Sequence, residues 1–175
     1  MQKITYGIHD TEIGKIVIGQ SDKALCWLGF MVEGYKGNGL DRMKGHFPGA
    51  DFTRDDSSTA ALMQRIIKAW KADDLKSVPL DLKGTAFQIS VWNALLNIPA
   101  GSVKSYHDVA KEIDRPKAMR AVGTAVGSNP VSLIVPCHRV VQSSGALGNY
   151  GWGVDLKEKL LDLETQNIAH TVKAA

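Results

Sequence analysis

The segment LKSVPLDLKG, residues 75–84, divides the chain into two parts whose sequence patterns differ. Pro79 and the extended apolar pattern around it are typical of a connecting segment. Strand-favouring runs precede this segment, and closely spaced helical runs follow it. We therefore place a domain boundary here, between a domain of residues 1–80 and a domain of residues 81–175. At 175 residues and 44% hydrophobic composition, the chain has enough apolar side chains for two small cores.

The first part predicts a small antiparallel sheet and one helix. Residues 3–22 alternate around the turn HDTEIG, and residues 24–30, ALCWLGF, favour a strand that ends before the glycine-rich residues 33–39. These runs predict an antiparallel meander. Residues 57–74 begin with Ser and Thr side chains that can cap a helix. Apolar side chains follow at helical spacing, namely Leu62, Ile66, Ile67 and Trp70.

The second part predicts short helices, so the expected fold class is α+β. Residues 85–98 begin with Thr85, a good N-cap, and carry an apolar stripe before the sequence PAGS ends the helix. Residues 105–113 begin with Ser105 and have Asp108 three residues later, a spacing typical of a capping box.

The segment RPKAMRAVGTAVGSNP, residues 115–130, predicts a further helix, joined to the preceding one by the tight connection DRP. Pro116 suits its first position, and SNP ends it. Two such helices predict a helix-turn-helix with residues 117–128 as the recognition helix. Five small residues lie along that helix: Ala118, Ala121, Gly123, Ala125 and Gly127. They suit either close approach to another surface or tight packing in a core, and both interpretations stay open.

Residues 115–154 contain no Asp or Glu, although the chain has 18 acidic residues in all. The stretch holds four basic side chains and a histidine: Arg115, Lys117, Arg120, His138 and Arg139. It is either a buried segment with a few solvated cations or a positive face for phosphates. The net charge of +3 does not by itself indicate a nucleic-acid partner.

No apolar run approaches the about 18 to 20 residues that a membrane span requires. The N-terminus has no hydrophobic core of a secretory signal, so we expect a cytoplasmic protein without membrane contact. Cys26 and Cys137 lie in no C-x-x-C pattern. We therefore expect two free thiols and no cysteine-rich zinc site.

Cys137 and His138 lie side by side in LIVPCHRVV, residues 133–141. A thiol becomes a strong nucleophile when a base or a positive field lowers its pKa from about 8.5. Neighbours in a regular strand point to opposite faces, so a direct contact between the two side chains requires a bend, which Pro136 favours, or a bridging water. The histidine also requires an acceptor, and three candidates follow: Glu158, Asp162 and Glu164. From these residues alone, a buried structural cysteine is the favoured interpretation, and a nucleophile stays open.

The motifs GTAFQISVWNAL, IPAGSVKSYHDVA, RPKAMRAVG, SNP, IVPCHRVV and GALGNYGWGVDLKEKLLDLE occur in this order over residues 84–164. In this region the chain strongly resembles the O6-alkylguanine-DNA alkyltransferases. The resemblance implies a ribonuclease H-like N-terminal domain and a winged-helix-like C-terminal domain. It also implies that Cys137 takes the alkyl group from O6 of guanine in double-stranded DNA and keeps it as a thioether. Each chain would then react once, as a monomer and without a cofactor or metal.

The resemblance also implies roles for single residues. His138 acts on Cys137 through a water, and Glu164 orients His138. Asn129 joins the recognition helix to the active-site segment. Tyr106 rotates the target nucleotide and protonates the departing guanine. Arg120 takes the place of the nucleotide that leaves the base stack.

The remaining residues implied by the resemblance contact DNA or line the base pocket. The small-residue helix lies in the minor groove, which is only about 6 Å wide. DNA contacts are expected from Lys117, Ala118, Ala121, Gly123 and Arg139, besides Arg120 and Tyr106. The pocket is expected to be lined by Val126, Pro136, Tyr150, Gly151 and Trp152, of which Trp152 would narrow it. Two alternatives are a non-catalytic lesion-binding relative, which typically lacks the cysteine, and a Cys-His-Glu hydrolase or thiol transferase.

Overall fold

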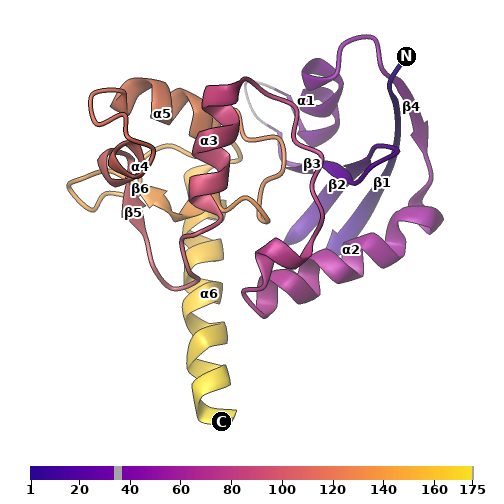
Figure 1. The fold of residues 1–175 in the computed structure, drawn as a ribbon. Coiled ribbons are helices and arrows are strands. Elements are labelled where there is room, and N and C mark those ends of the chain that lie inside the picture. The colour runs from indigo at the N-terminus through magenta and orange to yellow at the C-terminus, as the bar shows by residue number, and fades with distance from the viewer. Residues whose placement is uncertain (34–36, 175) are drawn as a thin grey trace. The chain divides into compact units, whose positions relative to one another are not determined.

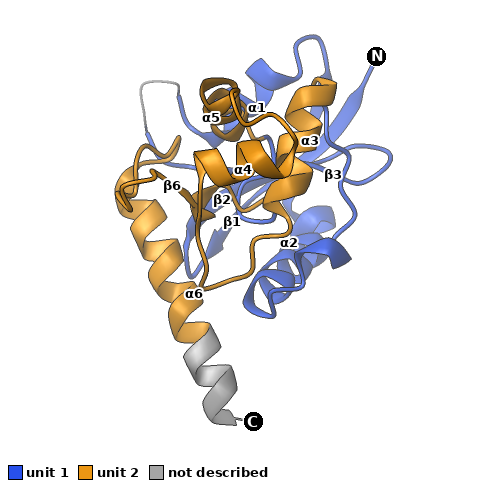
Figure 2. Ribbon diagram, turned by 60° about the vertical axis from the view of Figure 1, so that its left-hand side comes forward, with its two compact units in different colours: residues 1–83, 130–134 blue, residues 84–129, 135–175 orange. Residues whose placement is uncertain are grey.

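The computed structural model describes residues 1–33 and 37–174, with side chains described up to residue 167. The chain forms two compact units, one of residues 1–83 and 130–134 and one of residues 84–129 and 135–175 (Figure 2). The sequence-based boundary gives residues 130–134 to the second domain, whereas in the structure they pack with unit 1. No helix in the described ranges is long and apolar enough to cross a membrane.

Unit 1 contains a four-stranded sheet in the order β3-β2-β1-β4 (Figure 1). Its strands are β1 (Lys3–Thr11), β2 (Gly14–Gln20), β3 (Leu25–Phe30) and β4 (Asp51–Arg54). The first three form the expected antiparallel meander. The expectation of a wholly antiparallel sheet is wrong, because β4 pairs with β1 in parallel. A helix and not a tight turn connects β3 to β4, so the fourth strand is free to take this direction.

Two helices belong to unit 1, α1 (Gly39–His46) and α2 (Asp56–Lys71), followed by the short 3-10 helix η1 (Leu75–Ser77). The sequence predicted α2, but α1 was missed because glycines precede it. The Asn38 side chain caps α1 by accepting from the backbone of Leu40 and Asp41, each at 3.0 Å. A Cβ at Gly39 would lie 2.8 Å from the Phe30 carbonyl oxygen, so only glycine fits there. Residues 34–36 of the predicted glycine-rich turn lie outside the described residues.

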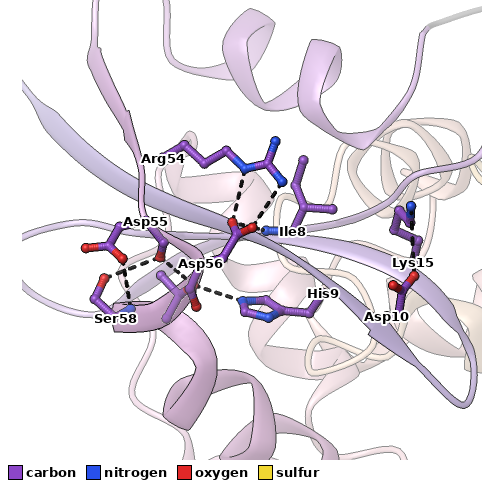
Figure 3. A network of polar contacts seen from close by, with 9 residues as sticks. Ile8, His9, Asp10, Lys15, Arg54, Asp55, Asp56 and Ser58 are labelled. Atoms are coloured by element: carbon purple, nitrogen blue, oxygen red, sulfur yellow. Dashed lines mark hydrogen bonds and ion pairs between the residues drawn. The ribbon is translucent and has the colours of Figure 1, made fainter.

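A polar network fastens the start of α2 to β1 (Figure 3). The Asp56 carboxylate accepts from the Ile8 backbone at 3.0 Å and from both Nε and Nη2 of Arg54. One turn further along α2, Thr59 Oγ1 lies 2.9 Å from His9 Nε2. These bonds tie side chains of the first turn of α2 to the strands, while the Asp55 side chain caps the helix by accepting from the Ser58 backbone at 3.0 Å.

Unit 2 is mainly helical (Figure 1). Its elements are α3 (Ala86–Leu95), β5 (Lys104–Ser105), α4 (Tyr106–Glu112), α5 (Met119–Gly127), the 3-10 helix η2 (Cys137–Arg139), β6 (Val140–Val141) and α6 (Val154–Ala174). The predicted capping residues are confirmed, since Thr85 with Gln88 and Ser105 with Asp108 form reciprocal capping boxes. The Trp92 indole nitrogen donates to the Ala125 carbonyl oxygen at 2.8 Å, which ties α3 to α5.

The helix-turn-helix expectation agrees with α4 and α5, but the second helix begins later than predicted. Its first residue is Met119, and Ala118 is the N-cap. The placement of Pro116 at the first helical position is therefore wrong. Pro116 lies instead in the turn that follows Asp114, a residue with a φ of 58°. The chain reverses at that left-handed residue, so the turn extends past the proline before a helix can begin.

Candidate active site

Cys137, His138 and Arg139 form one short 3-10 turn, η2, directly after Pro136. Backbone bonds close the turn, from Cys137 to the Val135 carbonyl oxygen at 2.8 Å and from Arg139 to that of Pro136 at 2.9 Å. The bend expected at the proline is confirmed. Cys137 is 6% exposed and His138 is fully buried, so both residues lie in the interior of unit 2.

Glu164 on α6 is the acceptor for His138. The His138 Nε2 atom lies 2.9 Å from Oε1 of Glu164, and both side chains are buried. The other two candidates, Glu158 and Asp162, are exposed on the same helix. Sequence spacing alone left this choice open, and the burial of one face of α6 decides it.

The Glu164 carboxyl is ionised at neutral pH. Burial alone would raise its pKa, but hydrogen bonds and charges from His138 and Arg139 outweigh burial and lower the pKa to about 2. A carboxylate only accepts hydrogen bonds, so the proton of a neutral His138 ring lies on Nε2. The Nδ1 atom is then the acceptor, and it is buried without a hydrogen-bond partner among the described residues. The ring therefore has one nitrogen fixed by Glu164 and one available as a base.

Arg139 was expected to contact DNA, but the structure places it in the interior of unit 2. Its side chain is fully buried. The guanidinium donates from Nε and Nη2 to the two oxygens of Glu164, at 3.0 and 2.5 Å, and from Nη1 to the Ile98 carbonyl oxygen at 2.6 Å. The burial argues against a DNA contact, because the Arg139 guanidinium is paired with the Glu164 carboxylate of α6 and is not available to a phosphate.

Asn129 follows α5 and is 5% exposed. Its Nδ2 donates to the Val135 carbonyl oxygen at 2.8 Å. The bond links the end of the predicted recognition helix to the chain two residues before Cys137, as expected. Val126 of α5 and Pro136 were both predicted to line the pocket, and both are buried.

Tyr106 is the first residue of α4, and its side chain is partly exposed. Burial raises the pKa of its phenol, and a negative charge on Cys137 raises it further. A Cβ built on Gly123 would lie 3.8 Å from the Tyr106 ring, so α5 passes close to it. The phenol is therefore protonated at neutral pH and electrostatically coupled to the thiol.

The residues of α5 divide into a buried face and an exposed one. Val122, Ala125 and Val126 are buried, whereas Arg120 and Ala121 are exposed. The predicted DNA-contacting residues before and along the helix, Lys117, Ala118 and Gly123, are exposed or partly exposed. The buried face agrees with packing in the core, and the exposed face leaves close approach to another surface as a prediction.

The loop before α6 carries the three remaining pocket candidates. Tyr150 is partly exposed, Gly151 is exposed and Trp152 is 6% exposed. Sequence reasoning missed Lys157, which is fully buried on α6. Its ammonium donates to the carbonyl oxygens of Val140, Leu147 and Asn149, which closes the base of this loop. The signal was available: Lys157, Leu160 and Glu164 share one helical face.

Comparison with known proteins is consistent with this geometry. Residues 86–166 match the family described as 6-O-methylguanine DNA methyltransferase, DNA binding domain. The chain is 40% identical over 161 residues to a methylated-DNA–protein-cysteine methyltransferase of Methanosarcina acetivorans, covering 91% of this chain and 97% of that protein. The chain belongs to the methylated-DNA–protein-cysteine methyltransferase family.

Other members of this methyltransferase family differ in length. The chain is 35% identical over 165 residues to the bifunctional transcriptional activator/DNA repair enzyme Ada of Escherichia coli, covering 94% of this chain and 46% of that protein. The chain thus spans about half the length of that relative. A crystal structure of Mycobacterium tuberculosis OGT in complex with DNA matches with a TM-score of 0.73 and 36% identity, covering 93% of this chain and 94% of the other. The methyltransferase fold therefore includes both units.

Proposed function

We propose that the chain is a DNA repair alkyltransferase that moves the alkyl group of O6-alkylguanine, chiefly O6-methylguanine, irreversibly to its own Cys137. The observation that carries the proposal is the ordered set of Cys137, His138 and Glu164 in unit 2. The set supplies a thiol, an adjacent base and a carboxylate that orients the base. The names and activities of the relatives support the same reaction.

The reaction begins with proton transfer. The Cys137 thiol gives its proton through a water to His138 Nδ1, while Glu164 holds the opposite side of the ring. The thiolate then attacks the alkyl carbon, so that an S–C bond forms as the C–O6 bond breaks. The electron pair of the broken bond stays on the guanine, and the product on the protein is a thioether. Because a thioether has no acyl carbonyl to hydrolyse, each chain reacts once.

Tyr106 supplies the proton for the departing guanine. While Cys137 is a thiolate, its negative charge raises the pKa of the Tyr106 phenol and keeps the proton there. Once the thioether forms, the negative charge has moved to the guanine, which then takes the phenolic proton. The proton on His138 replaces it through water, which restores the balance of protons.

The DNA is held by the exposed face of α5. Ala118, Ala121 and Gly123 permit close approach to the minor groove, and Lys117 meets phosphates. Arg120 enters the base stack when the damaged nucleotide turns out of the duplex, which offsets part of the few kcal/mol of unstacking. The flipped base lies against Tyr150, Gly151 and Trp152. We further propose a monomer in the cytoplasm that needs no cofactor or metal.

Mass spectrometry of the intact protein tests the proposal. After incubation with a duplex that contains O6-methylguanine, the protein should gain one methyl group on Cys137 and no more. The Cys137→Ala variant should gain none, and Cys26→Ala should react as the unchanged protein does. Binding without mass gain would instead favour a lesion sensor. Release of an acyl probe from Cys137 by water would favour a thiol hydrolase.

A further inference from the structure

Arg139 contacts Glu164, the carboxylate that orients the His138 ring. Its guanidinium grips both oxygens of Glu164, and the oxygen that receives Arg139 Nε also receives His138 Nε2. The third side of the guanidinium is fixed by the Ile98 carbonyl oxygen, just after α3. A two-point grip of this kind fixes the plane of a carboxylate as well as its position.

Arg139 is the direct counter-charge of the Glu164 carboxylate. Before reaction, the Glu164 carboxylate and the Arg139 guanidinium sum to zero beside a neutral thiol and a neutral imidazole. After the thiol proton moves to His138, thiolate and imidazolium again sum to zero. Without Arg139 the buried Glu164 carboxylate would lose its direct ion-pair partner, which is strongly unfavourable. A second proton on the His138 ring would offset the carboxylate charge and would occupy the nitrogen that has to accept the thiol proton.

We infer that Arg139 is a positioning residue of the alkyl transfer: it aims Glu164 at His138 and offsets its charge, so that His138 keeps an unprotonated Nδ1 in the resting protein. This inference rests on the proposed function for its biological meaning, but its effect on the Cys137 thiol is measurable without DNA.

Two other ionisable groups, Tyr106 and Lys157, interact with Cys137, and neither is altered in the Arg139 variants. Tyr106 of α4 is neutral, with a pKa that burial and Cys137 raise. Lys157 of α6 is cationic, although burial lowers its pKa. From the segment after α3, the group that contacts Arg139 is the Ile98 carbonyl oxygen, which carries no net charge. A change in the pH dependence of the thiol in an Arg139 variant therefore reports the guanidinium charge.

The experiment measures alkylation of Cys137 by iodoacetamide as a function of pH, with Cys26 as the internal buried reference. In Arg139→Gln the acid limb of the rate profile should shift to higher pH by on the order of one pH unit. At a fixed pH on that limb, the rate of alkylation should then be about tenfold lower. Arg139→Lys keeps the charge and should retain the limb of the unchanged protein. A uniform loss of rate in Arg139→Gln, with the limb in place, would overturn the inference.

A second pair of variants covers the case in which Arg139→Gln does not fold. In Glu164→Gln the guanidinium stands alone, and in Arg139→Gln/Glu164→Gln both charges are gone. The limb should lie at higher pH in the double variant than in Glu164→Gln, and equal limbs would overturn the inference. The same variants are then assayed for methyl transfer from a duplex. If the iodoacetamide profiles behave as expected but the unchanged protein transfers no methyl group, the proposed function is contradicted and the role of Arg139 stands.

Discussion

The ammonium of Lys157 donates to the Val140 carbonyl oxygen at 2.6 Å, directly after the turn that holds Cys137. The same ammonium reaches Leu147 and Asn149, on the loop that carries the predicted base pocket. One buried cation thus fastens the two sides of a loop rich in glycine. Gly145, Gly148 and Gly153 all have φ between 73° and 101° there, a backbone conformation that glycine adopts without strain.

Replacement of Lys157 by Met should destabilise the protein by about 2 to 4 kcal/mol, because buried carbonyl oxygens lose a charged donor. Urea denaturation measures this loss. The control is Lys159→Met, an exposed lysine two residues along the same helix, which should change the free energy of unfolding by less than about 0.5 kcal/mol. Equal effects of the two substitutions would contradict an anchoring role for Lys157.

Replacement of Glu164 by Gln should slow methyl transfer about 10- to 100-fold, because a neutral amide no longer fixes the tautomer of His138. Rapid-quench kinetics with a methylated duplex measure the rate constant under single-turnover conditions. Glu158→Gln, on the exposed side of α6, is the matched control and should react at the unchanged rate. A normal rate in Glu164→Gln would remove Glu164 from the mechanism.

Glu164 should also make stability depend on pH. Its folded pKa of about 2 lies below the ordinary 4.5, so the unfolded chain binds the proton more readily. The ion pair therefore contributes its full stability above about pH 5 and loses it progressively as the pH falls toward 2, an effect on the order of 3 kcal/mol. Urea melts between pH 6 and pH 2 should show a steeper decline in the unchanged protein than in Glu164→Gln. Parallel declines would contradict the buried ion pair.

Arg120→Ala and Tyr106→Phe should impair repair of duplex DNA far more than reaction with free O6-benzylguanine, if that base fits the pocket. A free base needs no rotation out of a stack, so only the duplex reaction includes the cost of flipping. The loss on duplex should be on the order of tenfold or more for each variant, since unstacking amounts to a few kcal/mol. Arg115→Ala, an exposed cation before α5, serves as the charge control. Equal losses on both substrates would argue against a flipping role.

Local sequence signals predicted the local features well. Thr85 and Ser105 cap their helices as expected, because a cap depends on residues within one turn of it. The bend at Pro136 followed for the same reason. The meander of β1, β2 and β3 was predictable from alternation, whereas the parallel pairing of β4 with β1 depends on where α1 carries the chain.

Burial of charged residues was not predictable from their neighbours in the sequence. Arg139 was expected to be a surface cation, and its partner Glu164 lies 25 residues away on another element. Lys157 shares a helical face with Leu160 and Glu164, which indicates burial, but its acceptors are backbone carbonyls and could not be named from the sequence. Spacing alone did not select Glu164 among three acidic residues; the family resemblance implied it, and the structure shows its contact with His138. Tertiary contacts, and not composition, decide whether such a side chain meets solvent.

The return of residues 130–134 to unit 1 has a consequence for how the chain folds during synthesis. Val131, Leu133 and Ile134 are fully buried, and Leu28 of β3 exchanges backbone bonds with Pro130 and Ser132. Unit 1 is therefore incomplete until residue 134 has left the ribosome, by which time α3, α4 and α5 have already emerged. A fragment that begins at residue 84 would carry Val131, Leu133 and Ile134 without strand β3, so the unit that contains Cys137 is a poor candidate for expression alone.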